Sequence, residues 1–140
     1  MQYTTQQGVQ GICPTGFHLP TDEEWKILEG AADGYYVIGD PEWDNSGYRG
    51  YNLGINLKTT SGWLGEINGT DLLGFSAMPA GLRDSSGPFY GHAYISTWWT
   101  SSESGPNKAY SRWLRDTETT SMRYHDYKGY GYSVRCLRDD

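Results

Sequence analysis

The clearest periodic pattern in the chain lies near its beginning and predicts a helix. Residues 21–24, Thr-Asp-Glu-Glu, form a capping box in which Thr21 is the N-cap residue and Glu24 occupies position N3. We expect this helix to end between Gly30 and Gly34. The apolar positions at helical spacing are Trp25, Leu28 and Ala32, with Ile27 and Ala31 beside them.

The pattern changes after the helix and becomes that of short strands and turns. Residues 40–47 carry turn chemistry, and residues 52–58 alternate weakly, with Leu53, Ile55 and Leu57 on one side, which predicts a short strand. The strands predicted further along are residues 75–83 and 89–94, joined as a hairpin by the turn at 84–88, then 95–102, 109–115, 121–125 and a closing strand at 131–138.

These elements predict an α+β fold, with a small, mostly antiparallel sheet, one or two helices and long ordered loops. In the strand at 95–102, Trp98 and Trp99 must face opposite sides of the sheet. A chain of 140 residues has material for one core, and its 12 Tyr and 6 Trp against 3 Phe indicate a core built largely from rings. We assign residues 13–140 to a single domain, and residues 1–12 to a linker or a truncated N-terminal edge.

Net charge and hydropathy argue against nucleic acid as a partner and against direct membrane insertion. With 11 basic against 17 acidic residues, the net charge of −6 has the wrong sign for binding a phosphate backbone, so nucleic acid is not expected. Direct insertion into a membrane is not expected either, because no apolar run is long enough to span a bilayer. The polar N-terminus also lacks the features of a secretion signal.

The two cysteines lie at opposite ends of the chain, and we expect them to form a disulfide. A Cys13–Cys136 bond would close a loop of 136 − 13 = 123 residues. The chain-entropy argument gives such a bond about 5 kcal/mol of stability. The alternative is two separate buried thiols, as is common in cytosolic proteins.

Searches for cofactor and catalytic motifs give no positive result. Asp40, Glu42 and Asp44 suggest calcium, but an EF-hand would need Gly at Asn45 and Glu at Tyr51. We therefore predict no cofactor, and calcium sites assembled from scattered loops stay open as an alternative. The three histidines are scattered without metal-ligand spacing, and a carboxylate pair of the glycosidase type remains only a minor alternative.

Several segments in the same order resemble the Fibrobacter succinogenes major paralogous domain family, which is abundant in bacterial surface proteins. These segments are residues 16–25, 74–81, 98–103 and 131–136. The family in turn resembles the formylglycine-generating, sulfatase-modifying enzymes. The resemblance implies a C-type-lectin-like fold with neighbouring termini and a displayed loop region. The cysteine pair that those enzymes use before the final strand has no counterpart between Lys108 and Gly131, so we do not expect an enzyme.

Aromatic and arginine side chains, which often dominate binding energy, are concentrated in the last third of the chain. Along residues 109–115, Trp113 and Arg115 share one face of the strand and Tyr110 the other, and the sequence does not say which face is buried. The residues predicted to bind a ligand are Tyr94, Tyr110, Trp113, Arg115, Arg123, Tyr124, His125, Asp126 and Tyr127.

These observations together predict a non-catalytic ligand-recognition module. We expect it to act outside the cell or at the cell surface, within a larger bacterial or phage surface protein, as an adhesin-like or receptor-binding domain whose ligand is a protein or a glycan. The alternatives are a variable protein of a diversity-generating retroelement with the same fold, a formylglycine-generating-type oxidase or glycosidase, and a structural spacer domain.

Overall fold

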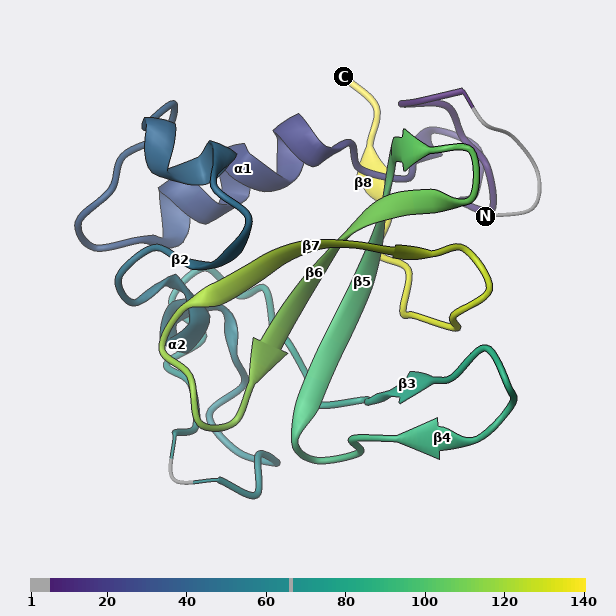
Figure 1. Cartoon of the computed structure of the whole chain (residues 1–140). Helices are drawn as coiled ribbons and strands as arrows, with labels where there is room; N and C mark the ends of the chain where they lie inside the picture. The colour runs from purple at the N-terminus through teal and green to yellow at the C-terminus, as the bar shows by residue number, and fades with distance from the viewer. Residues whose placement is uncertain (1–5, 66) are drawn as a thin grey trace.

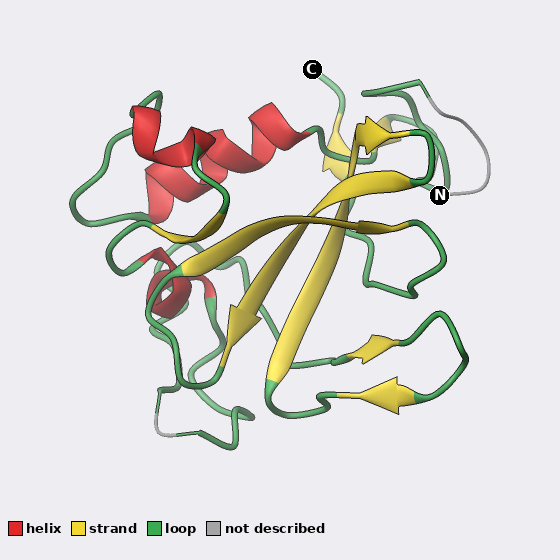
Figure 2. Ribbon diagram, in the orientation of Figure 1, coloured by secondary structure: helices red, strands yellow, loops and turns green. Residues whose placement is uncertain are grey.

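The computed structural model describes residues 6–65 and 67–140 and has an α+β fold (Figure 1, Figure 2). Its helical elements are α1 (Asp22–Ala32), the 3-10 helix η1 (Pro41–Asp44) and α2 (Leu53–Leu57). Its strands are β1 (Phe17–His18), β2 (Gly47–Arg49), β3 (Leu82–Arg83), β4 (Phe89–Tyr90), β5 (Ile95–Gly105), β6 (Lys108–Arg115), β7 (Ser121–Tyr127) and β8 (Leu137–Arg138). Within the described residues, no helix has the length and apolar character needed to cross a membrane.

A four-stranded antiparallel sheet in the order β2-β7-β6-β5 forms the centre of the molecule. The main core lies between this sheet and α1, where the rings of Trp25 and Trp98 are 5.7 Å apart and Phe75 packs edge-on against both. Trp99 belongs to a second, smaller core that also contains Tyr132. The prediction that the two adjacent tryptophans face opposite sides of the sheet is therefore confirmed.

The start and end of α1 agree with the prediction. Thr21 accepts a hydrogen bond from the Glu24 backbone, and the Glu24 carboxylate accepts one in return from the Thr21 backbone, so the capping box is present. The expected inclusion of Ile27 and Ala31 in the apolar face was wrong, because both residues are exposed. The buried side of α1 instead combines Trp25 and Ala32 with the charged residues Asp22 and Glu29, and Leu28 is partly buried beside them.

Where residues 52–58 were predicted to form a strand, Leu53–Leu57 form the helix α2 instead. Leu53 and Leu57 are fully buried in the main core, and their separation of four residues matches one helical turn as well as it matches strand alternation. Gly54 allows the close approach, since its N–H donates to the Thr119 carbonyl at 2.8 Å and a Cβ at this position would clash with that carbonyl. The α2 helix thus depends on a tertiary contact that periodicity does not show.

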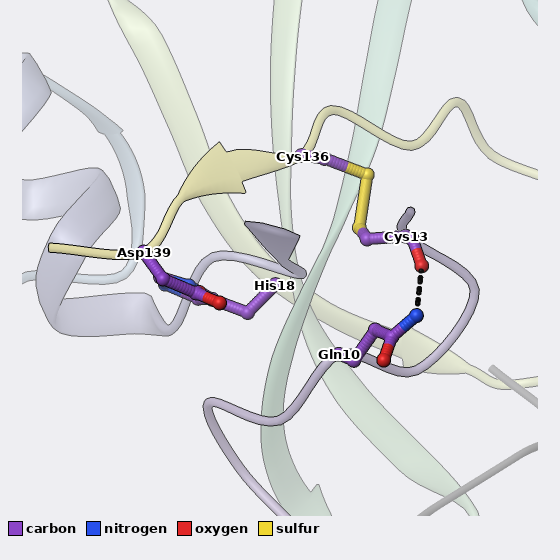
Figure 3. The surroundings of a disulfide bond; sticks show 5 residues. All are labelled: Gln10, Cys13, His18, Cys136 and Asp139. Carbon is purple, nitrogen blue, oxygen red and sulfur yellow. Dashed lines mark hydrogen bonds and ion pairs between the residues drawn. A yellow bond between two sulfur atoms is a disulfide. The ribbon is translucent and has the colours of Figure 1, made fainter. Parts of the chain in front are cut away.

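Segments near the two ends of the chain, around Cys13 and Cys136, lie close together and are covalently joined. Cys13 and Cys136 form the predicted disulfide, with their Cα atoms 5.8 Å apart, and β1 pairs with β8 beside it (Figure 3). The predicted closing strand at 131–138 is only partly present. Gly131 and Ser133 make isolated bridges to β3 and β5, and only Leu137–Arg138 forms a strand, because this segment changes partners along its length.

The predicted hairpin in the middle of the chain is also shorter than expected. Its turn at 84–88 is correct, but only β3 and β4 pair across it, with Leu82 opposite Tyr90 and Arg83 opposite Phe89. In Figure 1 this hairpin lies at the side of the molecule opposite the loop that follows α1.

Candidate functional site

A buried network of charged side chains occupies the sheet face that packs against α1, here called the inner face. Glu29 of α1 accepts hydrogen bonds from Arg49 of β2 at 2.5 Å and from Arg112 of β6 at 2.9 Å. Asp22 pairs with Arg112 at 2.8 Å and with Arg123 of β7 at 2.7 Å. Burial alone would raise the pKa of Asp22, but the Arg123 hydrogen bonds and the Arg112 charge lower it below its ordinary value. The network ties α1 to three strands and is enclosed, which suits a structural role.

Alternation along β6 decides which side chains reach the opposite face of the sheet. Arg112 and Leu114 point toward α1, where Leu114 belongs to the main core. Ser111, Trp113 and Arg115 therefore lie on the other side, here called the outer face. The candidate site is on this outer face.

Three strands contribute a row of side chains across the outer face. Their register places Tyr48 of β2 opposite Met122 of β7, and Met122 opposite Trp113 of β6. Tyr124 lies two residues beyond Met122 on β7 and has the same orientation, while Arg115 extends the surface at the end of β6. Tyr48 is 42% exposed and Tyr124 46% exposed, so this surface presents aromatic rings to solvent.

The indole of Trp113 is held in place by its neighbours. Its Nε1–H is shared between the Ser111 hydroxyl at 3.2 Å and the Asp126 carboxylate at 3.3 Å, and Ser111 itself donates to Asp126 at 2.7 Å. Tyr132 packs edge-on against Trp113 and stacks on Trp99. Burial, and then the Asp126 charge, raise the pKa of Tyr132, so its hydroxyl stays protonated. The outer face therefore has a fixed aromatic centre, which reduces the entropy lost on binding.

Comparison with protein families gives one match, to the model described as the Fibrobacter succinogenes major domain, and it covers residues 2–138. The chain belongs to this family. No curated protein and no solved structure matches it.

The segments that carry the family resemblance lie mainly where the chain ends meet and in the core. Residues 16–25 and 131–136 surround the disulfide and the start of α1, and residues 98–103 form the middle of β5. The exposed outer-face residues Tyr48, Arg115 and Tyr124 lie outside these segments. The motifs thus leave out the exposed residues of the candidate site, although two motif residues, Trp99 and Tyr132, support its Trp113.

The predicted binding residues do not all lie on one surface. Those on the outer face are Trp113, Arg115, Tyr124 and Asp126. Those at the alternate positions, which face the inner side, are Tyr110, Arg123, His125 and Tyr127. Tyr94 lies in the loop before β5, half exposed, and its carbonyl accepts a hydrogen bond from the Asp116 backbone. We expected the predicted binding residues to form one continuous surface, but strand alternation places them on both sides of the sheet.

Arg123 departs most clearly from the expectation that this segment is exposed. It is only 8% exposed, its guanidinium is paired with Asp22, and it lies 4.2 Å from the centre of the Tyr110 ring. A ligand could reach this side chain only by breaking the inner-face network. We therefore exclude Arg123 from the candidate site and assign it to the core.

Sequence reasoning missed two residues of the outer face. Tyr48 was not considered because β2 is only three residues long and follows a segment rich in turn residues. Met122 lies in a predicted strand, and its separation of two residues from Tyr124 could have indicated a shared face. The pairing of Tyr48 with β7 joins positions 74 residues apart, from 122 − 48, and no local pattern signals such a contact.

Lys58 is buried and holds two loops through its ammonium group. Its ammonium group donates to the Glu118 carbonyl at 2.7 Å and to the Ile67 carbonyl at 3.4 Å, and it lies 5.0 Å from the centre of the Trp63 ring. Burial lowers the pKa of Lys58 to about 8. These contacts fasten the loop after α2 to the turn between β6 and β7.

The acidic residues considered for calcium have other contacts. Asp40 caps η1, Asp44 pairs with Lys26 at 2.6 Å, and Glu42 accepts hydrogen bonds from Gly50 and Asn45. Across residues 6–65 and 67–140, no group of three or more His, Cys, Asp or Glu side chains is arranged to hold a metal ion.

Proposed function

We propose that this domain is a non-catalytic recognition module that binds a protein or a glycan outside the cell through its outer face. The observation that carries the proposal is the row of Tyr48, Met122 and Trp113, with the Trp113 indole fixed at one end and the exposed Tyr48 at the other. Aromatic rings give a large contact area at small entropic cost, and Arg115 adds directional hydrogen-bond donors.

The proposed architecture is C-type-lectin-like, and the proposed setting is a larger bacterial or phage surface protein. Neighbouring termini, two α-helices and an antiparallel sheet with long connections support the first proposal. The disulfide supports the second, because such bonds persist in oxidising compartments outside the cytosol.

Non-catalytic action is part of the proposal. Both cysteines of the chain are used in the disulfide, so no thiol pair is left for chemistry of the formylglycine-generating kind. We expect neither oxygen consumption with a cysteine-containing peptide and copper, nor turnover on a broad panel of glycosidase substrates. Turnover in either assay would contradict this part of the proposal.

The binding proposal is tested by probing a glycan array and an array of extracellular proteins with the labelled domain. For a ligand found in this way, Tyr48→Ala and Tyr124→Ala should each weaken binding about 30-fold, the factor that corresponds to a hot spot of about 2 kcal/mol. The matched control is Tyr127→Ala, because Tyr127 is also exposed but lies at an inner-side position. Melting of all three variants should stay close to that of the wild type.

Two outcomes would contradict the proposal. In the first, Tyr127→Ala weakens binding as much as the outer-face variants do, which would show that the outer face is not the binding site. In the second, neither array yields a ligand, which would favour a structural spacer.

A further inference from the structure

A second aromatic surface, which shares no residue with the outer-face site, lies in the loop after α1 and just beyond β2. Its members are Tyr35, Tyr36 and Tyr51, here called the tyrosine patch. The rings of Tyr35 and Tyr36 meet edge to face at 4.9 Å, and those of Tyr35 and Tyr51 are 6.2 Å apart. Tyr35 is 74% exposed and Tyr51 63% exposed, so both residues are largely open to solvent.

The tyrosine patch is held by the fold rather than lying on a free loop. The Asp33 carboxylate accepts hydrogen bonds from the backbones of Tyr35 and Tyr36, each at 2.9 Å, and of Tyr51 at 2.8 Å. Tyr36 also packs edge-on against the buried Trp43. One carboxylate therefore fixes both segments that carry the rings, and the core supports them from below.

The surroundings of the tyrosine patch are acidic. Asp33, Asp40 and Glu42 all act on Tyr36, whose pKa is raised first by the charge of Glu42, then by burial and by the other acidic groups. Among the described residues, no Lys, Arg or His nitrogen lies within 4.0 Å of these three carboxylates. Their charge is thus not neutralised by an ion pair there.

We propose that the tyrosine patch binds a cationic segment of a partner protein, with lysine or arginine side chains stacked on the exposed rings. Aromatic ring faces attract cations electrostatically, and the neighbouring carboxylates, which are hydrogen-bonded but have no ion-pair partner, add to this attraction. A neutral apolar partner would gain from the rings but not from the charge, and an acidic partner would be repelled. This surface is separate from the proposed binding site and does not depend on it.

The probe for this proposal is a hexa-arginine peptide with blocked ends, titrated into the full chain while the tyrosine ring resonances are followed by NMR. Tyr35→Leu/Tyr51→Leu removes both exposed rings but keeps apolar side chains, and we expect it to weaken binding about 5- to 30-fold, since each ring contributes a cation–π contact. Tyr35→Phe/Tyr51→Phe keeps the ring faces and should bind nearly as well as the wild type.

A second pair of variants separates local charge from net charge. Asp40→Asn/Glu42→Gln should weaken peptide binding several-fold while keeping the capping hydrogen bonds. Asp84→Asn/Asp140→Asn changes the net charge equally but lies in the β3–β4 turn and at the C-terminus, so binding should change little (Figure 1).

Three results would overturn the proposal. They are no shift of the tyrosine ring resonances at millimolar peptide, equal binding by the Leu and Phe double variants, and equal weakening by the two charge variants. Tighter binding of an uncharged peptide of phenylalanine and serine would instead assign the patch to an apolar partner.

Discussion

On the inner face of the sheet, Arg112 and Arg123 are buried against α1 and paired with acidic side chains, whereas Arg115, on the outer face of the same pair of strands, is exposed. Arg115 has no ion-pair partner among the described residues. Tyrosines divide in the same way, since Tyr110 stacks under the Arg123 guanidinium while Tyr124 projects to solvent. The same residue types therefore stabilise the fold on one face and remain available for binding on the other.

Under the proposed function, the two faces would divide stability from recognition. The inner face contains an ion network and the larger ring-built core, so most substitutions there should affect folding. The exposed side chains of the outer face make fewer contacts within the fold. They can therefore be changed at small cost in stability, which suits a surface that must match a ligand.

The largest expected effect concerns the Cys13–Cys136 disulfide, which belongs to neither face and joins segments near the two ends of the chain. Cys136→Ser should lower the free energy of unfolding by about 5 kcal/mol, because the bond closes nearly the whole chain. Thermal melting of the variant, and of the wild type with and without reductant, measures this loss. Two reactive thiols in the native wild-type protein would show that the bond is absent.

Breaking the inner-face network should come next in size. Glu29→Ala leaves Arg49 and Arg112 buried without this shared partner, and we expect a loss of about 3–5 kcal/mol in urea unfolding. Glu23→Ala, on the exposed side of the same helix, is the matched control and should change stability by less than about 0.5 kcal/mol. If the two variants lost similar free energies of unfolding, the ion network would contribute no stability beyond the change in helix propensity.

A pair of arginine variants compares the two faces directly. Arg123→Ala should cost about 1.5–3 kcal/mol, because it removes charged hydrogen bonds to Asp22, which keeps Arg112 as a partner. Arg115→Ala should cost less than about 0.5 kcal/mol. Urea unfolding of both variants tests the difference, and a reversed order would contradict the assignment of the faces.

A smaller, pH-dependent effect is expected where the chain ends meet. The hydrogen bond to Asp139 at 2.6 Å raises the pKa of His18, against the opposing effect of burial, and Glu24 adds to the rise (Figure 3). Because the folded-state pKa lies above the ordinary 6.5, this stabilisation is fully present below pH 6.5 and is lost as the pH rises through the folded-state value.

The melting temperature should therefore fall as the pH rises through that range. His18→Gln should remove this dependence and leave unchanged the acid-side contribution of Asp22, whose lowered pKa does not depend on His18. An unchanged pH profile in the variant would rule out this role of His18.

Local chemistry in the sequence was enough to predict part of the fold. The capping box placed α1, and β-branched and aromatic residues placed β5, β6 and β7. The α2 segment was misassigned because Leu53 and Leu57 fit a helical turn and a strand equally well, and the contact of Gly54 with Thr119 that favours the helix is not local.

The candidate site could be predicted only in part. Alternation along β6 correctly grouped Trp113 with Arg115, but both faces of that strand carry rings and arginines, so the pattern could not show which face α1 covers. The deciding contact, Arg112 with Glu29, joins residues 83 apart in the chain. Tyr48 required the pairing of a three-residue strand, which no sequence pattern indicates.

The separation of folding from binding between the two faces is tested most directly by a surface-display library of single substitutions across β6 and β7. The library is sorted once for protease resistance and once for binding to a ligand found on the arrays. We predict that substitutions at Arg112, Leu114 and Arg123 abolish resistance, whereas those at Arg115 and Tyr124 keep resistance and lose binding. Loss of resistance at Arg115 and Tyr124 as well, or full binding by their substitutions, would contradict the account.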